Sequence, residues 1–238
     1  MRALLLLGLA ACGARAAAST PIPDPPAIAL GSLPPKWDAG EQTTWQVFYR
    51  NVAVGRVGLV VDGDTARTSF RTGLLASVLQ PMSYDLVTRV DHGHPRSMSE
   101  TLVVDGARNA TDATIEGAKL TIGERTQLVP GGTDLHTLHS ALGVVRAWAT
   151  RGAQPGYLWL LHQGGLYRLD VFAPARDEAL GLRALRVDGI VRALSGEPPI
   201  AVHLWLAANR DRTPLRFEID AGSTRVLAEV VESTAAFD

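Results

Sequence analysis

The segment Leu215-Arg216-Phe217-Glu218-Ile219-Asp220 alternates apolar and charged residues without interruption. Successive side chains of a β-strand point to opposite faces, so this pattern predicts a strand with one buried and one solvated face. The same period of two recurs at Trp45, Val47 and Tyr49, and again in residues 57–61, 167–171 and 185–188. Turn signals separate these segments at intervals of roughly 8–12 residues, which is typical of antiparallel strands joined by short loops.

One segment departs from this period. Apolar residues recur at steps of three and four between positions 135 and 149, which predicts an amphipathic helix over about residues 134–151. Thr133 or Asp134 is suited to cap its start, and Gly152 to end it. A second, short helical turn is predicted at residues 74–79, before Pro81. The predicted fold is mainly β: a curved antiparallel sheet, or an open or half barrel, with one packed α-helix.

Cys12 is the only cysteine of the 238 residues, and it ends a short apolar leader that begins with Met1 and Arg2. The stretch Leu9-Ala10-Ala11-Cys12 resembles the lipobox of bacterial lipoproteins. The resemblance implies that residues 1–11 are a signal peptide and that Cys12 carries acyl chains which anchor the protein in a membrane. Gly13 in place of Asp favours the outer membrane over the inner one, with the protein facing the periplasm.

Two other interpretations of the leader remain open. Cleavage after Ala14-Arg15-Ala16 would release a soluble exported protein. Alternatively, the N-terminus is untargeted and the cysteine is there by chance. Residues 12–36 contain six prolines, which exclude a helix or an inner strand and predict an extended linker. The predicted organisation is therefore a signal peptide at 1–11, a lipidated linker at 12–36 and one β-rich domain at 37–238.

The composition excludes several functional classes. The formal net charge is −1, with 23 basic and 24 acidic residues, and no basic stripe is present, so we expect no nucleic-acid partner. With no cysteine after Cys12, the domain has neither a disulfide nor a thiolate nucleophile. The sequence also contains no signature that predicts a cofactor. The fold must therefore be held by apolar burial.

The order of features resembles a bacterial envelope family known as domain of unknown function 3108. Residues 37–41 read Trp-Asp-Ala-Gly-Glu and precede the aromatic strand at 45–49, and residues 55–58 supply a Gly-x-x-Gly strand. The helix near 134–150 and the turn at Pro155-Gly156 follow in the same order. The most specific likeness is the stretch from Trp205 to Leu215, in which Asn209 stands where the family commonly has Asp. The resemblance implies an exported, mostly β protein and supplies no reaction.

Histidines are the candidates for chemistry. His92 and His94 lie in a predicted loop, and His136 and His139 lie three residues apart in the first half of the predicted helix, where they are weak candidates for metal ligands. No established zinc spacing is present, and the competing interpretation is that these histidines are ordinary turn and packing residues. The Gly-x-Ser-x-Gly nucleophile motif is absent. We therefore expect no enzymatic activity, no catalytic residues and no bound metal.

Aromatic residues give the stronger indication of function. Six of them are candidate ligand-binding residues in a groove between sheet and helix: Trp45, Tyr49, Trp148, Trp159, Tyr167 and Trp205. The competing interpretation is an ordinary aromatic core. The leading hypothesis is a non-enzymatic envelope lipoprotein that binds a lipid-like ligand or an envelope protein. The alternatives are a structural or assembly accessory without a ligand, and an envelope hydrolase or metal-binding protein.

Overall fold

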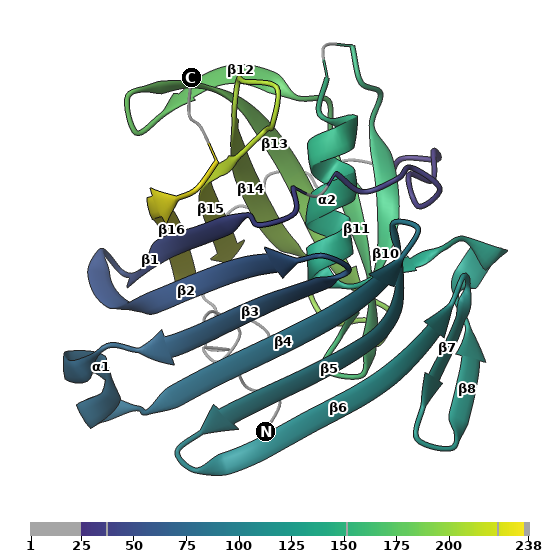
Figure 1. Ribbon diagram of the computed structural model, residues 1–238, viewed down its shortest axis with the longest axis horizontal. Helices are drawn as coiled ribbons and strands as arrows, with labels where there is room; N and C mark the ends of the chain where they lie inside the picture. Colours follow the sequence, from purple (N-terminus) through teal and green to yellow (C-terminus); the bar gives the residue numbers. More distant parts are fainter. Residues whose placement is uncertain (1–24, 37, 151, 223, 236–238) are drawn as a thin grey trace.

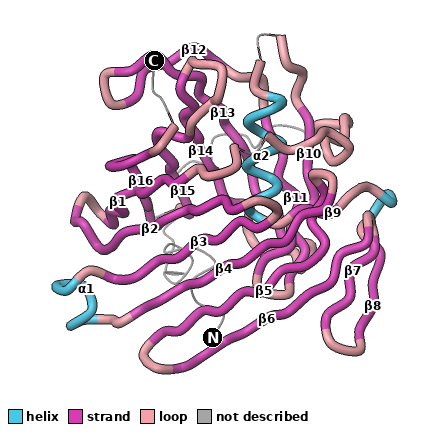
Figure 2. The backbone as a smooth tube through the Cα atoms, in the orientation of Figure 1, coloured by secondary structure: helices cyan, strands magenta, loops and turns pink. Residues whose placement is uncertain are grey.

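The computed structural model describes residues 25–36, 38–150, 152–222 and 224–235. Leader residues 1–11, the predicted lipidation site Cys12 and the following residues up to 24 lie outside the described part. Strands dominate the described chain, as Figure 2 shows, which confirms the mainly β prediction. Within the described residues, no helix is both long enough and apolar enough to cross a membrane.

Eight strands form the first half of the sheet, and each strand after the first pairs antiparallel with the one before it in the sequence. They are β1 (Gln42–Tyr49), β2 (Val52–Asp62), β3 (Thr65–Thr72), β4 (Met82–Asp91), β5 (His94–Val104), β6 (Ala107–Glu116), β7 (Lys119–Ile122) and β8 (Arg125–Leu128). The short helix α1 (Leu74–Leu79) joins β3 to β4, as the sequence predicted. This half is thus an uninterrupted meander.

The second half returns to the first through β16, which pairs with β1. Its strands are β9 (Leu135–His136), β10 (Gly156–His162), β11 (Gly165–Val171), β12 (Ala175–Ala179), β13 (Leu182–Ala193), β14 (Ile200–Ala207), β15 (Pro214–Ala221) and β16 (Thr224–Ser233). The order across the sheet runs from β8 down to β1, then from β16 to β9, with β12 attached to β13 alone. Among the described strands, only the pairing of β9 with β10 is parallel.

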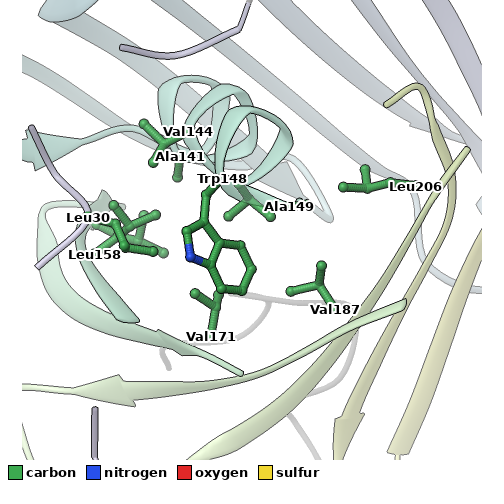
Figure 3. Close-up of a cluster of buried hydrophobic side chains, with 11 residues drawn as sticks. Leu30, Ala141, Val144, Trp148, Ala149, Leu158, Val171, Val187 and Leu206 are labelled. Atoms are coloured by element: carbon green, nitrogen blue, oxygen red, sulfur yellow. The ribbon is translucent and has the colours of Figure 1, made fainter. Parts of the chain in front are cut away.

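The sheet curves around α2 (Leu138–Trp148), as Figure 1 shows, but its terminal strands β8 and β9 are not paired with each other. The fold is therefore an open, barrel-like sheet with a packed helix, which confirms the predicted class. Figure 3 shows how Val144 and Trp148 of α2 face Leu158 of β10, Val171 of β11 and Leu206 of β14. This cluster fills the space between the helix and that part of the sheet with buried side chains.

The helix is shorter than the predicted range of 134–151. Thr137 is its N-cap: the Thr137 hydroxyl accepts a hydrogen bond from the Ser140 N–H, and the Ser140 hydroxyl accepts one from the Thr137 N–H. This capping box starts the helix at Leu138, four residues after the predicted start. The preceding residues Leu135 and His136 extend along β10 instead. The capping box at Thr137 and the pairing of Leu135 and His136 with the edge of the sheet therefore set the start of the helix, although the apolar spacing begins earlier.

Residues 28–36, placed in the linker by the sequence, pack against the domain. The Leu30 N–H donates to the Tyr157 carbonyl at 2.9 Å, and the Lys36 N–H donates to the Gly143 carbonyl at 2.9 Å. Leu30 is 4% exposed and belongs to the cluster around α2. We call residues 28–36 the N-terminal strap. The proline content was a sound reason to exclude these residues from a helix or an inner strand, but it did not exclude packing against a helix.

Two glycines leave room for this strap. A Cβ at Gly156 would lie 2.5 Å from Cγ of Leu30, and a Cβ at Gly143 would lie 2.7 Å from Cβ of Pro35. Both distances are far below ordinary van der Waals contact, so a larger residue at either position would displace the strap. The glycines therefore set how closely the strap approaches β10 and α2.

Candidate functional site

An apolar groove lies between the C-terminal end of α2 and the N-terminal strap. It is an open, shallow groove of about 360 Å³. Most of its lining side chains are apolar; the lining residues are Ile28, Leu30, Leu33, Ala147, Trp148, Thr150, Ala153 and Gln154. The indole N–H of Trp148 donates to the Gln154 carbonyl at 3.1 Å, so the ring presents its apolar surface to the groove with its polar atom satisfied.

Trp148 is the predicted ligand-binding aromatic that lines this groove. Tyr167 packs at the edge of the same cluster around α2, half-buried on β11. The remaining predicted aromatics lie in other clusters. Trp45 is buried on β1, where its ring meets Phe217 edge-on at a centroid distance of 5.5 Å and its N–H donates to the Pro214 carbonyl. Tyr49 lies half-buried at the end of the same strand.

Trp159 and Trp205 point away from α2. Leu204 and Leu206 of β14 contact the cluster around α2, and the alternation of the strand sends the intervening Trp205 to the outer face. There its N–H donates to Oδ2 of Asp177 on β12 at 3.0 Å. Trp159 of β10 packs into a separate cluster with residues of β4–β7. The six aromatics thus do not line one groove, and five of them are distributed through the core and the outer face.

The four candidate histidines have separate partners. His92 is exposed beside Asp91, whereas His94 lies 3.4 Å from Asp134. The buried His136 ring lies 3.1 Å from the Gly31 carbonyl of the strap. Burial is the main cause that lowers the pKa of His136 below its ordinary value. Among the described residues, no group of three or more His, Cys, Asp or Glu side chains is arranged to hold a metal ion.

His139 is buried between α2 and the sheet, and each of its ring nitrogens lies within hydrogen-bond distance of a threonine hydroxyl. Its Nε2 is 2.8 Å from the Thr68 hydroxyl, and its Nδ1 is 2.8 Å from the Thr88 hydroxyl. Burial lowers the pKa of His139 to about 3, so the ring is neutral at physiological pH. The histidine therefore connects α2 to β3 and β4 as a structural hydrogen-bonding group.

A buried polar cluster, which no sequence pattern indicated, lies where the sheet approaches itself. Oε1 of Glu100 on β5 lies 2.6 Å from Nδ1 of His162 on β10. The Tyr84 hydroxyl donates to the same oxygen at 2.7 Å, and the Gln163 N–H donates to Oε2 at 2.5 Å. Burial alone would raise the pKa of Glu100, but these partners outweigh it and the pKa is lowered. No local pattern marks this cluster, because Glu100 and Gln163 are 63 residues apart in sequence.

A second missed cluster centres on Arg146 of α2. Its Nη1 donates to Oε2 of Glu41 at 2.7 Å, and its Nη2 donates to Oδ2 of Asp38 and to the Asp211 carbonyl. Arg146 and Glu41 are both buried. The helix is thereby fixed to the start of β1 and to the turn before β15. A charged residue on an otherwise apolar helix was the available signal, but its partners could not be deduced from spacing.

A depression of about 520 Å³ lies on the outer face of β4–β7. It differs from the groove beside α2 in the polarity of its lining. Most of its lining side chains are polar, among them Arg89, Asp112 and Thr121. These residues alternate with the buried ones on the same strands, so they belong to the solvated face of the sheet. Val87, Met98 and Ala113 also line the depression, so its walls are mixed, whereas the groove beside α2 is mostly apolar.

No family model matches this sequence, and no curated protein matches it. Among solved structures, the chain is similar to a β-barrel-like protein of the domain of unknown function DUF1849 from Brucella abortus. The two share 11% identity with a TM-score of 0.60, over 81% of this chain and 96% of that one. This likeness agrees with the barrel-like fold described above and concerns the fold alone.

Two further solved structures are similar at lower TM-scores. A DUF1089 family protein from Pseudomonas aeruginosa shares 14% identity with a TM-score of 0.44, over 71% of this chain and 91% of that one. The lipoprotein LppX of Mycobacterium tuberculosis shares 11% identity with a TM-score of 0.29, over 84% of this chain and 90% of that one. At these scores the likenesses add no argument about this chain.

Proposed function

We propose that the protein is a non-enzymatic, lipid-anchored envelope protein that holds a lipid-like ligand in the apolar groove beside α2. The observation that carries the proposal is the groove itself, whose lining is mostly aliphatic with one buried tryptophan. A volume of about 360 Å³ accommodates part of an acyl chain rather than a whole lipid. The proposed site differs from the one predicted from the sequence, because the groove lies between the helix and the strap and not between the helix and the sheet.

The anchor rests on Cys12 and its lipobox-like context. An acylated Cys12 would hold the chain at a membrane, with the groove-forming strap beginning sixteen residues later at Ile28. The same proposal places the protein in the cell envelope, at the outer membrane. It also includes membership of the domain of unknown function 3108 family. Glu41 and Asp211, which lie in the two ends of that resemblance, both contact Arg146 in this chain.

Filling the groove tests ligand binding. Ala153 lines the groove, so Ala153→Trp should occupy its volume without disturbing the core behind Leu30. The matched control is Ala175→Trp, which adds the same indole to an exposed position of β12. Binding of a fluorescent fatty acid to the full chain should fall at least about tenfold in the first variant and stay unchanged in the second. Equal binding by both variants would exclude the groove as the site.

The anchor is tested separately in cells. Cys12→Ala should move the protein out of the membrane fraction, and globomycin should leave a larger, unprocessed species. If neither treatment changes its size or location, the lipoprotein assignment fails while the groove assignment remains testable on the purified chain. Absence of fatty-acid binding by the unaltered chain would instead favour an accessory protein without a ligand.

A further inference from the structure

Three chain reversals gather at one end of the sheet. The register places the turn at Arg50 and Asn51, the helix α1 and the turn at Asp105 and Gly106 side by side, and Figure 1 shows them along one edge. Hydrogen bonds join them: the Gly73 N–H donates to the Val54 carbonyl at 2.8 Å, and the Asp105 N–H donates to the Pro81 carbonyl at 3.0 Å. We call residues 50–54, 73–81 and 104–108 the α1 rim.

The α1 rim carries large apolar side chains that the protein does not cover. Leu74 is 87% exposed and Val78 is 81% exposed, and Val52 on the adjacent turn is 64% exposed. Leu74 and Val78 are four residues apart on a helix, so they share one face. Single exposed aliphatics are common on protein surfaces, but three on one protruding edge form a coherent apolar feature.

The charges beside these side chains are largely basic. Arg50 and Arg108 are exposed, and neither forms an ion pair within the described part of the chain. The guanidinium of Arg50 lies 5.4 Å from the centroid of the Tyr49 ring. Asp105 is the acidic residue of the rim and receives the Gln80 side-chain amide. This arrangement suits a bilayer surface: the aliphatic side chains match the acyl chains, and the arginine and tyrosine side chains behind them match the headgroup region.

The apolar interior of the sheet reaches this rim. Half-buried Tyr49, Val54 and Val104 lie at the rim ends of β1, β2 and β5 and pack against a buried cluster that contains Phe70 and Met82. The exposed tips therefore continue into an apolar wall rather than ending on a polar surface.

We propose that the α1 rim docks on the surface of an anionic bilayer, with Leu74 and Val78 inserted among the acyl chains and Arg50 and Arg108 at the phosphates. The shape favours a bilayer over a protein partner. A stable protein interface needs about 800 Å² of complementary surface on each side, whereas the rim exposes three large aliphatic side chains at the tips of chain reversals. A fluid bilayer accepts such tips individually.

Vesicle binding tests the proposal independently of the acyl anchor. The full chain carrying Cys12→Ser is mixed with vesicles of phosphatidylcholine and phosphatidylglycerol and sedimented. The double variant Leu74→Ser/Val78→Ser should bind at least about tenfold more weakly, because two aliphatic side chains no longer leave water. The matched control is Leu128→Ser, since Leu128 is 73% exposed on β8, away from the rim. This control should bind like the parent chain.

Two further measurements decide between insertion and simple adsorption. Arg50→Glu/Arg108→Glu should weaken binding to the anionic vesicles and leave binding to pure phosphatidylcholine vesicles unchanged. In the Cys12→Ser background, an environment-sensitive dye on Val78→Cys should shift to shorter wavelength on vesicle binding, and the same dye on Leu128→Cys should not. Unchanged vesicle binding by the serine double variant, or no shift at position 78, would overturn the proposal.

Discussion

Glu100 on β5 and His162 at the end of β10 lie 2.6 Å apart, Oε1 to Nδ1, and connect two strands that are not paired in the sheet. Both side chains are buried. The Gln163 N–H strengthens the connection by donating to the other carboxylate oxygen. Side-chain contacts therefore connect β5 and β10, which share no backbone pairing.

Removing the charge of Glu100 should weaken this connection. Glu100→Gln keeps the size of the side chain but leaves His162 and the Tyr84 hydroxyl with a weaker acceptor in a buried site. Leaving a buried polar group with a weaker partner typically costs about 1–3 kcal/mol. Urea unfolding at pH 7 should show that loss, while Glu116→Gln on the exposed face of β6 should change the free energy of unfolding by less than about 0.5 kcal/mol.

Acid should destabilise the protein partly through His139. Its pKa is lowered to about 3 in the folded state, whereas an unfolded histidine titrates near 6.5. The unfolded chain then binds more protons, so this contribution to stability is complete above about pH 6.5 and is lost progressively as the pH falls towards 3.

His139→Gln removes the titration and retains a group able to bond the two threonine hydroxyls. Between about pH 6.5 and 5, unfolding free energy should therefore fall less steeply in this variant than in the parent chain. Equal slopes in the parent chain and His139→Gln would show that the ring is not held neutral by burial.

Arg146 and Glu41 should be strongly coupled. Arg146→Met preserves the apolar stem but leaves the Glu41 carboxylate buried without its cation, at a cost of about 3–5 kcal/mol in unfolding free energy. Glu41→Gln in the same background should restore part of that loss, since the buried charge is then gone. A double-mutant cycle should give a coupling energy of about 0.5–3 kcal/mol; additive effects would mean that the pair does not hold α2 to β1.

The N-terminal strap should respond to Gly156. Gly156→Ala places a methyl group against Leu30, so the strap should detach locally and become sensitive to protease near residue 30. Leu30→Ala in the same chain should restore part of the protection by making room for the methyl group. A matched Gly106→Ala change, at a site with open space around it, should leave the protease pattern of the strap unaltered. Protection equal to that of the parent in Gly156→Ala would contradict the tight approach.

Local periodicity was sufficient to predict the strands, because alternation at segments such as 215–220 depends only on which face of each strand is buried. It also placed the short helix α1, which a proline two residues beyond its end helps to stop. The helix α2 was found but was predicted too long, since the sequence does not say that Leu135 and His136 have a strand edge to pair with. The proline content likewise led to the prediction that residue 30 lies in an extended linker, whereas Leu30 packs against the domain.

The sequence by itself determined an antiparallel, mainly β domain with one packed helix, because burial patterns of period two and 3.6 are local properties of the chain. Only the tertiary structure decided which aromatic lines a groove, which face Trp205 occupies, and that Glu100 meets His162 and Arg146 meets Glu41. These relationships depend on the curvature of the sheet, which brings together residues sixty to a hundred positions apart. Contacts at that separation leave no periodic trace in a single sequence.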